Sequence, residues 1–314
     1  TVAFGSTAAG VTVSGTVDVG RITFGAKQSN APVVLTGGTI RLGGSTVAAP
    51  HIAPNGQAGV TAATINSAIL LNANVQINGL NFAGQVFTPL YLNGAISGGY
   101  DVTFFGPNGN NSFPAVVLGT QNTYSGNTRL NTTGTGANLE VKLGINDALP
   151  TTTVLTLDGP NGSGTAAGRY VRLDLNGFNQ TLAGLTTVVR SARRDQGIIN
   201  SSATFATLTV NNAADYSFTG QLGSGGQNAP ASSSSNFGLT KGGIGKLKLD
   251  PQNLDGSTAV LNIRYTGPTT INNGVLEIAN NGQLGNGNYA TNITIASGAG
   301  LLLDRKSTRL NSSH

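Results

Sequence analysis

The chain has 314 residues and a net charge of +5; 46 residues are glycine and 9% are charged. Glutamate occurs only at Glu140 and Glu277 and methionine is absent, so most strong helix formers are missing and a helical protein is excluded. Cysteine is also absent, which excludes disulfides and thiolate metal sites, and no apolar run reaches the roughly 18 residues of a membrane-spanning helix.

Short runs that alternate apolar and polar residues predict β-strands along the whole chain. In chain order these runs cover residues 11–13, 21–24, 39–42, 74–77, 101–104, 139–143, 154–157, 171–175, 208–210, 246–249, 275–278 and 293–295. Because the period is two, one face of each strand is expected to be buried and the other to face solvent.

The extent of the pattern favours a stack of coils over a closed sandwich. Strands separated by about 8 to 12 residues are typical of a sandwich or barrel. The pattern nevertheless continues from residue 11 to residue 303 without a composition break or a proline-rich linker. Repeats that bury their apolar faces only against neighbours form a solenoid. We therefore predict one all-β domain over residues 1–303, a parallel β-helix with loop insertions.

Asn-Gly pairs mark the expected corners between strands, at Asn78-Gly79, Asn93-Gly94, Asn176-Gly177, Asn273-Gly274 and Asn281-Gly282. Such pairs tolerate the positive φ that a corner requires. They are equally the signal of tight hairpins, so the turns alone leave parallel and antiparallel strands open. Loops ejected from the coils are expected at residues 48–58, 106–114, 159–168 and 223–236.

Two parts of the chain resemble the autotransporter-associated β-strand repeat. One is residues 239–249 (LTKGGIGKLKL) with its continuation at 265–276 (YTGPTTINNGVL), and an earlier copy at 124–130 (YSGNTRL) has Asn127 where Pro268 stands. Residues 173–185 (LDLNGFNQTLAGL) are similar to a motif of large exported proteins that carry these repeats. The resemblance implies a right-handed parallel β-helix that acts as a surface-displayed bacterial passenger, often an adhesin or stalk. The implied handedness agrees with the general preference of crossover connections.

The last eleven residues depart abruptly from the preceding pattern. Residues 304–314 (DRKSTRLNSSH) resemble one translated reading frame of a widely used sequencing adapter. We predict that they are an artefact tail outside the fold; the alternative is a natural basic tail that binds a partner.

Three aspartates are the best candidates for catalysis. Asp174, Asp195 and Asp215 follow one another at nearly equal intervals, each close to the length of one coil of a β-helix, so they could stack as acid/base groups acting on acidic polysaccharide. Against this, Asp174 lies between two inward-facing leucines and Asp215 follows turn residues, so we expect the carboxylates to face different sides. We assign no catalytic, cofactor or metal residue, and a β-helix lyase or hydrolase is the alternative.

Other polar motifs receive structural interpretations. The sequence Gly242-Gly243-Ile244-Gly245 is similar to a calcium-binding β-roll, but Lys246 stands where that motif needs aspartate, so we predict a turn that enters a strand. Arg190, Arg193 and Arg194 with Asp195 could bind sulfated or phosphorylated polymer, although a solvated loop is the favoured interpretation. His51 is expected in a proline-flanked surface loop.

These observations predict a non-catalytic passenger or stalk with a structural or adhesive role, secreted or displayed at the bacterial outer membrane. The expected partners are glycans or surface polymers. Nucleic acid is not expected, because the basic residues are spread thinly along the chain, and no membrane-spanning segment is expected.

Overall fold

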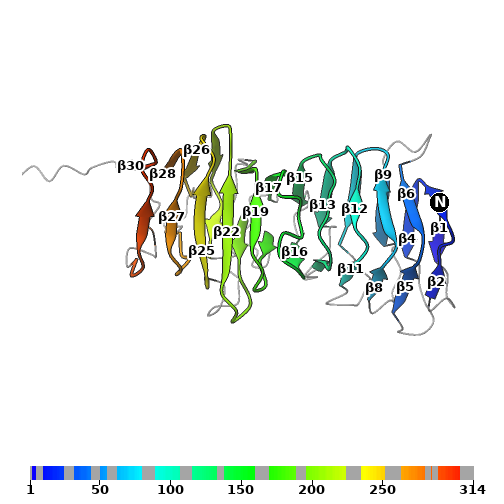
Figure 1. Cartoon of the computed structure of the whole chain (residues 1–314). Helices are drawn as coiled ribbons and strands as arrows, with labels where there is room; N and C mark the ends of the chain where they lie inside the picture. The colour runs from blue at the N-terminus through cyan, green and yellow to red at the C-terminus, as the bar shows by residue number, and fades with distance from the viewer. Residues whose placement is uncertain are drawn as a thin grey trace, which may run out of the picture.

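The computed structural model describes residues 2–4, 10–24, 32–43, 50–54, 62–79, 89–106, 115–132, 138–159, 170–188, 196–223, 235–251, 263–279, 284 and 289–304. Every regular element in these ranges is a β-strand, and the pairings between these strands are parallel. The strands stack into an elongated solenoid (Figure 1). This confirms the predicted all-β parallel β-helix and decides against hairpins among the described strands.

Two long sheets carry most of the strands. The eight-stranded sheet contains β1 (Val2–Phe4), β4 (Arg21–Phe24), β7 (His51–Pro54), β10 (Val75–Asn78), β13 (Val102–Gly106), β15 (Thr128–Thr132), β17 (Val154–Asp158) and β20 (Gly184–Thr187). The nine-stranded sheet contains β2 (Gly10–Thr12), β5 (Val33–Thr36), β8 (Ala63–Ile65), β11 (Leu90–Leu92), β14 (Ala115–Leu118), β16 (Leu139–Leu143), β18 (Val171–Asp174), β21 (Gln196–Ile199) and β24 (Gln221–Leu222).

Three shorter sheets complete the solenoid. The N-terminal four-stranded sheet contains β3 (Thr16–Val19), β6 (Thr39–Leu42), β9 (Ala68–Leu71) and β12 (Ile96–Ser97). The five-stranded sheet contains β19 (Gln180–Leu182), β22 (Ala206–Asn211), β25 (Phe237–Gly242), β27 (Thr269–Ile271) and β29 (Ile293–Ile295). The C-terminal four-stranded sheet contains β23 (Tyr216–Phe218), β26 (Lys246–Leu249), β28 (Val275–Ala279) and β30 (Gly300–Asp304).

The core consists of apolar ladders that run along the stack, because alternation directs every second side chain inward. In the nine-stranded sheet one ladder is Val33, Ala63, Leu90, Val116, Val141, Leu173, Ile198 and Leu222, continued by bridges to Ile263 and Leu284. All of these side chains except Leu284 are buried. Each coil therefore covers the apolar face of the next, as in repeat proteins whose stability comes from neighbouring units.

Side-chain amides close a gap between two of the shorter sheets. No strand is assigned at residues 122–124 and 147–149, which lie between β12 and β19 in the stack. Asn122 Nδ2 donates to Ala148 O at 2.7 Å, and its Oδ1 accepts from Ile96 N at 2.8 Å. In the next coil Gln180 Oε1 accepts from Leu149 N at 3.0 Å. These buried amides supplement the few backbone hydrogen bonds between the coils here, such as Thr123 N to Ile96 O at 2.8 Å and Asp147 N to Asn179 O at 2.8 Å, so buried backbone groups keep partners.

Most predicted strands are present at or close to their predicted bounds, and residues 21–24, 39–42, 139–143, 246–249 and 293–295 match β4, β6, β16, β26 and β29. The predicted loop at 48–58 is partly wrong, because β7 occupies His51–Pro54. Residues 48–49 and 55–58 of that loop, and residues 107–114, 160–168 and 224–234 of the others, lie outside the described residues. β30 extends to Asp304, and residues 305–314 of the predicted tail lie outside the description.

Candidate functional site

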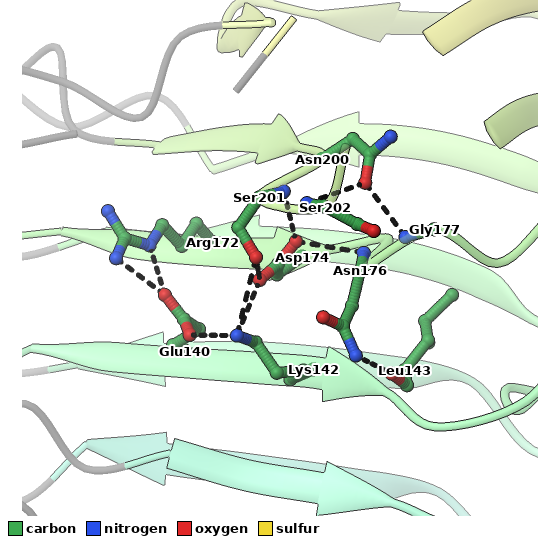
Figure 2. Close-up of polar contacts among 10 residues, drawn as sticks. All are labelled: Glu140, Lys142, Leu143, Arg172, Asp174, Asn176, Gly177, Asn200, Ser201 and Ser202. Atoms are coloured by element: carbon green, nitrogen blue, oxygen red, sulfur yellow. Dashed lines mark hydrogen bonds and ion pairs between the residues drawn. The ribbon is translucent and has the colours of Figure 1, made fainter. Parts of the chain in front are cut away.

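A densely connected polar cluster lies on the outer face of β16 and β18 (Figure 2). Leu139, Val141 and Leu143 point into the core, so alternation leaves Glu140 and Lys142 on the outer face. In β18, Arg172 and Asp174 occupy the equivalent outer positions. The register sets Glu140 directly opposite Arg172 and Lys142 directly opposite Asp174, so each charge faces its opposite across the ladder.

Arg172 binds Glu140 with two guanidinium nitrogens. Its Nε lies 2.6 Å and its Nη2 2.5 Å from Glu140 Oε2, and its guanidinium carbon lies 3.8 Å from the ring centroid of Tyr170, a cation–π distance. Only 8% of the Arg172 side chain is exposed. Its Nη1 is buried and has no hydrogen-bond partner, so one of the three guanidinium nitrogens donates no hydrogen bond.

Asp174 is the most enclosed carboxylate of the cluster. Its Oδ2 lies 3.0 Å from Lys142 Nζ and accepts from Ser201 Oγ at 2.5 Å. Its Oδ1 accepts from the backbone nitrogens of Asn176 and Ser201, both at 2.9 Å. The side chain is fully buried. Both carboxylate oxygens are therefore engaged within the cluster.

Lys142 joins the two ion pairs into one network. Besides Asp174 it lies 3.7 Å from Glu140 Oε1, and its Nζ donates to Ser201 Oγ at 3.3 Å. Burial lowers the pKa of Lys142, but attraction to Asp174 and Glu140 outweighs this cost and raises the pKa above its ordinary value. With two basic and two acidic side chains, the cluster balances its own charge.

Asn200 and Asn176 hold the corners around this cluster. Asn200 Oδ1 accepts from Gly177 N at 2.8 Å and Ser202 N at 3.2 Å. Asn176 has a φ of 50° and donates from Nδ2 to Leu143 O at 2.8 Å. Together these bonds fix the turns that place Ser201 over Asp174 (Figure 2).

A second charged cluster lies on the outer face of β26 and β28. Lys246 Nζ lies 2.8 Å from Glu277 Oε2, and Lys248 Nζ lies 3.7 Å from Glu277 Oε1 and 3.2 Å from Asp250 Oδ2. The side chains of Lys246 and Lys248 are 39% and 30% exposed. This cluster also balances two basic against two acidic groups, but its ammonium groups remain in contact with solvent.

Lys241 is a lysine that points into the core of the stack. It lies between Val210 and Ile271 in the ladder and is fully buried. Its Nζ donates to the carbonyl oxygens of Gly242, Gly243 and Asn273 at a corner. Burial lowers the pKa of Lys241 to about 8, although the charge of Asp215 acts in the opposite direction. Its ammonium group therefore provides hydrogen-bond donors to carbonyl oxygens at a corner where two coils turn.

The five-stranded sheet presents an uninterrupted file of threonines on its outer face. Consecutive strands place Thr181, Thr209, Thr240, Thr270 and Thr294 directly opposite one another. These side chains are part-buried or exposed, and neighbouring strands are about 4.8 Å apart. We call this set the threonine file. It offers hydroxyl and methyl groups at a regular spacing.

Of the three candidate aspartates, the two that the structure describes are not brought together, as expected. In the next coil the partner of Asp174 is Ile199, so the position that stacks on Asp174 lies beyond Asp195 in the chain. Asp215 lies before β23, where its Oδ1 accepts from Lys246 N at 2.7 Å. Asp195 lies outside the described residues. Asp174 therefore lies in β18 of the nine-stranded sheet, Asp215 lies at the turn before β23, and Asp174 is opposed by Lys142 instead of a second aspartate.

The other singled-out residues have mixed outcomes. His51 is in β7 opposite Arg21 and Gln76, so the loop assignment was wrong, although the residue is partly exposed. Gly243 has a φ of 68° between β25 and β26, and Lys246 pairs with Glu277, which confirms a turn that enters a strand. Arg190, Arg193 and Arg194 lie outside the described residues.

Sequence reasoning did not single out Glu140, Lys142, Arg172 or Ser201 as interacting residues. The signal available was the pair of charged alternations at 139–143 and 171–174, since each has two outward charges of opposite sign. The register that sets Glu140 opposite Arg172 depends on the length of the chain between the two strands. That register is seen only in the structure.

No group of three or more His, Cys, Asp or Glu side chains that could hold a metal ion occurs within the described ranges. No helix of membrane-spanning length and hydrophobicity is found among those residues either. Comparisons with protein-family models, curated proteins and solved structures found no match. The resemblance to autotransporter-associated repeats therefore stays a prediction from the motifs.

Proposed function

We propose that this chain is a rod-like segment of a secreted or surface-displayed bacterial protein, with a structural or adhesive role and no catalysis. The observation that supports this most is the apolar ladder from Val33 to Leu284, which connects successive coils along the stack. A stack in which each coil contacts only its neighbours extends in one direction and presents a long outer surface. Such a shape suits a stalk that holds a binding surface at a distance from the cell surface to which the protein is attached.

The charged side chains support a structural role, because both clusters satisfy their charges internally. Asp174 is fully buried beneath Lys142 and Ser201, and Glu140 is engaged by Arg172. A general acid or base must reach the proton that it transfers in a substrate. In this arrangement Asp174 has no free face to offer a sugar.

The adhesive part of the proposal rests on the threonine file. Its hydroxyl groups can donate and accept hydrogen bonds, and their side chains have few rotamers because threonine is branched at Cβ. A ligand that presents hydroxyl groups repeatedly, such as a neutral glycan, matches this chemistry. Binding through such a file is expected to be weak at each residue and to accumulate along the stack.

The adhesive role can be tested by substituting the centre of the file. We expect the Thr209→Val, Thr240→Val, Thr270→Val variant to lose binding to neutral glycans immobilised on a surface, because valine keeps the shape and strand propensity but lacks the hydroxyl. The control is Thr103→Val, Thr156→Val on the eight-stranded sheet. Equal binding by both variants and the unaltered chain would contradict the adhesive role.

A second candidate function is an enzyme that acts on acidic polysaccharide. The observation that favours it is that Glu140 and Asp174 lie 3.7 Å and 3.0 Å from Lys142 Nζ, beside the unused Nη1 of Arg172. The test is to assay the protein against pectin, alginate and hyaluronan. Turnover that is lost in Glu140→Gln or in an Asp174→Asn, Asp195→Asn, Asp215→Asn variant, with folding retained, would replace the passenger proposal.

A further inference from the structure

Asn-Gly pairs can modify themselves without an enzyme, and this chain contains many of them. The backbone nitrogen of glycine loses its proton to water and attacks the asparagine Cγ. A new N–Cγ bond forms, the Cγ–Nδ2 bond breaks, and the amide nitrogen takes a proton back from water and leaves as ammonia. Water then opens the resulting succinimide to aspartate or isoaspartate. The reaction requires a glycine nitrogen that is not held elsewhere and an amide carbon within reach of it, since misplaced reactants lose rate steeply.

Three of the four described pairs hold the glycine nitrogen in a hydrogen bond to another coil. The donors and acceptors are Gly79 N to Phe105 O at 2.9 Å, Gly94 N to Ile65 O at 3.0 Å and Gly177 N to Asn200 Oδ1 at 2.8 Å. Attack on the asparagine would first require each of these bonds to break. The stack itself therefore protects these three pairs.

The asparagine side chains of the same three pairs are also held. Asn78 Oδ1 accepts from Gln76 Nε2 at 2.7 Å, Asn93 Nδ2 donates to Asn66 Oδ1 at 3.0 Å, and Asn176 Nδ2 donates to Leu143 O at 2.8 Å. Each bond fixes the amide in a position set by a neighbour. Both reacting groups of these pairs are thus restrained independently.

Asn273-Gly274 differs in the partner of its glycine nitrogen and in the partner of its asparagine side chain. Gly274 N donates to Oδ1 of Asn273 itself at 2.8 Å, so the nitrogen lies beside the amide that it would attack. The pair forms the corner between β27 and β28, and Asn273 is exposed. Gly274 has a φ of 63°, and a Cβ at this position would lie 2.4 Å from Gly245 O. The corner therefore requires glycine, which leaves no side chain to shield the nitrogen.

We infer that Asn273 is a site of spontaneous deamidation. It is favoured over Asn78, Asn93 and Asn176 because Gly274 N contacts the amide of Asn273 itself instead of an acceptor in another coil. The product carries a carboxylate where the chain had a neutral amide. Isoaspartate also adds a backbone atom to a corner that packs against the carbonyl groups of Gly243 and Gly245. The Asn273 carbonyl accepts from buried Lys241 at 3.3 Å, so the modification changes both charge and geometry beside that lysine.

The test follows all four sites in one sample. The folded chain is incubated in heavy-oxygen water at neutral pH, digested under mildly acidic conditions and mapped by mass spectrometry. We expect the Asn273 peptide to take up heavy oxygen about tenfold faster than the other three, because a single hydrogen bond to be broken costs roughly that factor. Comparable or slower uptake at Asn273 would overturn the inference.

Two controls separate structure from sequence. In concentrated urea the hydrogen bonds are absent, so the four sites should react at similar rates; retention of the difference would also overturn the inference. The Asn273→Gln variant should lose the fast signal, because attack on glutamine forms a less favourable larger ring. Peptides containing Asn55, Asn108, Asn161, Asn281 and Asn286, which lie outside the described residues, are scored separately.

Discussion

The two charged clusters use similar sequence patterns but differ in the exposure of their basic side chains, which is 28% and 8% for Lys142 and Arg172 and 39% and 30% for Lys246 and Lys248. Both place outward glutamate opposite a basic residue of the adjacent strand, Glu140 opposite Arg172 and Glu277 opposite Lys248. Over the first cluster the next coil supplies Ser201, which covers Asp174. Beside Glu277 the next coil supplies Leu302, which is 48% exposed. The comparison teaches that alternation decides which charges face outward, whereas the following coil decides which side chains cover them.

Lys142 and Lys241 show the same principle for single groups. Lys142 contacts Asp174 and Glu140, and its pKa is raised although burial acts against it. Lys241 contacts only backbone carbonyl oxygens in the hydrogen bonds found for it, and its pKa is lowered to about 8. A nearby carboxylate compensates for lost hydration, and carbonyl dipoles do so less completely.

The largest expected effect is the removal of Asp174. Asp174→Ala leaves Lys142 without its closest counter-charge and Ser201 without its acceptor, so we expect a loss of about 3 kcal/mol in unfolding free energy, the lower end for a broken buried pair because Lys142 is partly hydrated. Urea denaturation followed by circular dichroism measures it. The Asp174→Ala, Lys142→Ala double variant should recover part of the loss. Additive effects of the two substitutions would contradict the coupling.

A smaller loss is expected at the second cluster. Glu277→Gln removes one charge that Lys246 and Lys248 share, but both ammonium groups can regain water. The same urea measurement should give a smaller decrease in midpoint than Asp174→Ala. High salt should reduce the difference between this variant and the unaltered chain, because salt screens exposed charges. A loss as large as that of Asp174→Ala would show that solvent access does not separate the clusters.

Lys241 should be visible in the pH dependence of stability. Its pKa of about 8 lies below the unfolded value of 10.5, so between these values the unfolded chain binds more protons and stability rises with pH. The contribution is at most about 1.4 kcal/mol for each pH unit. Below pH 8 both states are protonated and the contribution to the slope disappears. Lys241→Met should remove this rise in urea titrations at successive pH values. An unchanged slope would contradict the lowered pKa.

The smallest expected effect is at the exposed pair between β3 and β6. Arg41 Nη1 lies 3.0 Å from Asp18 Oδ1, and their side chains are 39% and 62% exposed. Arg41→Ala should cost about 0.5 kcal/mol or less, because exposed ion pairs gain little over hydrated charges. Thermal and urea unfolding check this. A cost comparable to that of Asp174→Ala would show that the burial of an ion pair does not determine its contribution to the free energy of unfolding.

The two aligned tyrosines show how local chemistry repeats while its place in the fold does not. Tyr124 bonds to Thr128 at 2.6 Å and Tyr265 to Thr269 at 2.5 Å, at the same sequence separation, and both tyrosines are buried. This agrees with the sequence alignment of the two segments. Thr128 begins β15 of the eight-stranded sheet, however, whereas Thr269 begins β27 of the five-stranded sheet.

By itself the sequence determined many of the strands, their inward and outward faces and two of the corners. Leu139, Val141 and Leu143 had to be buried together because alternation is a property of each strand. The Asn-Gly pairs predicted the corners correctly at Asn176-Gly177 and Asn273-Gly274, where glycine adopts positive φ. These features depend on residues a few positions apart, so they can be read without knowing the coil length.

Only the tertiary structure decided which coil faces which. Coil length varies along the stack, because the step from Val2 to its partner Ile22 is much shorter than the step from Ala206 to its partner Phe237. Insertions change this length without disturbing the ladder, since each coil contacts only its neighbours. An assumed constant length therefore cannot pair Glu140 with Arg172 or align the threonine file. Those arrangements depend on the lengths of all the turns and insertions between the paired strands, and no local sequence pattern specifies these lengths.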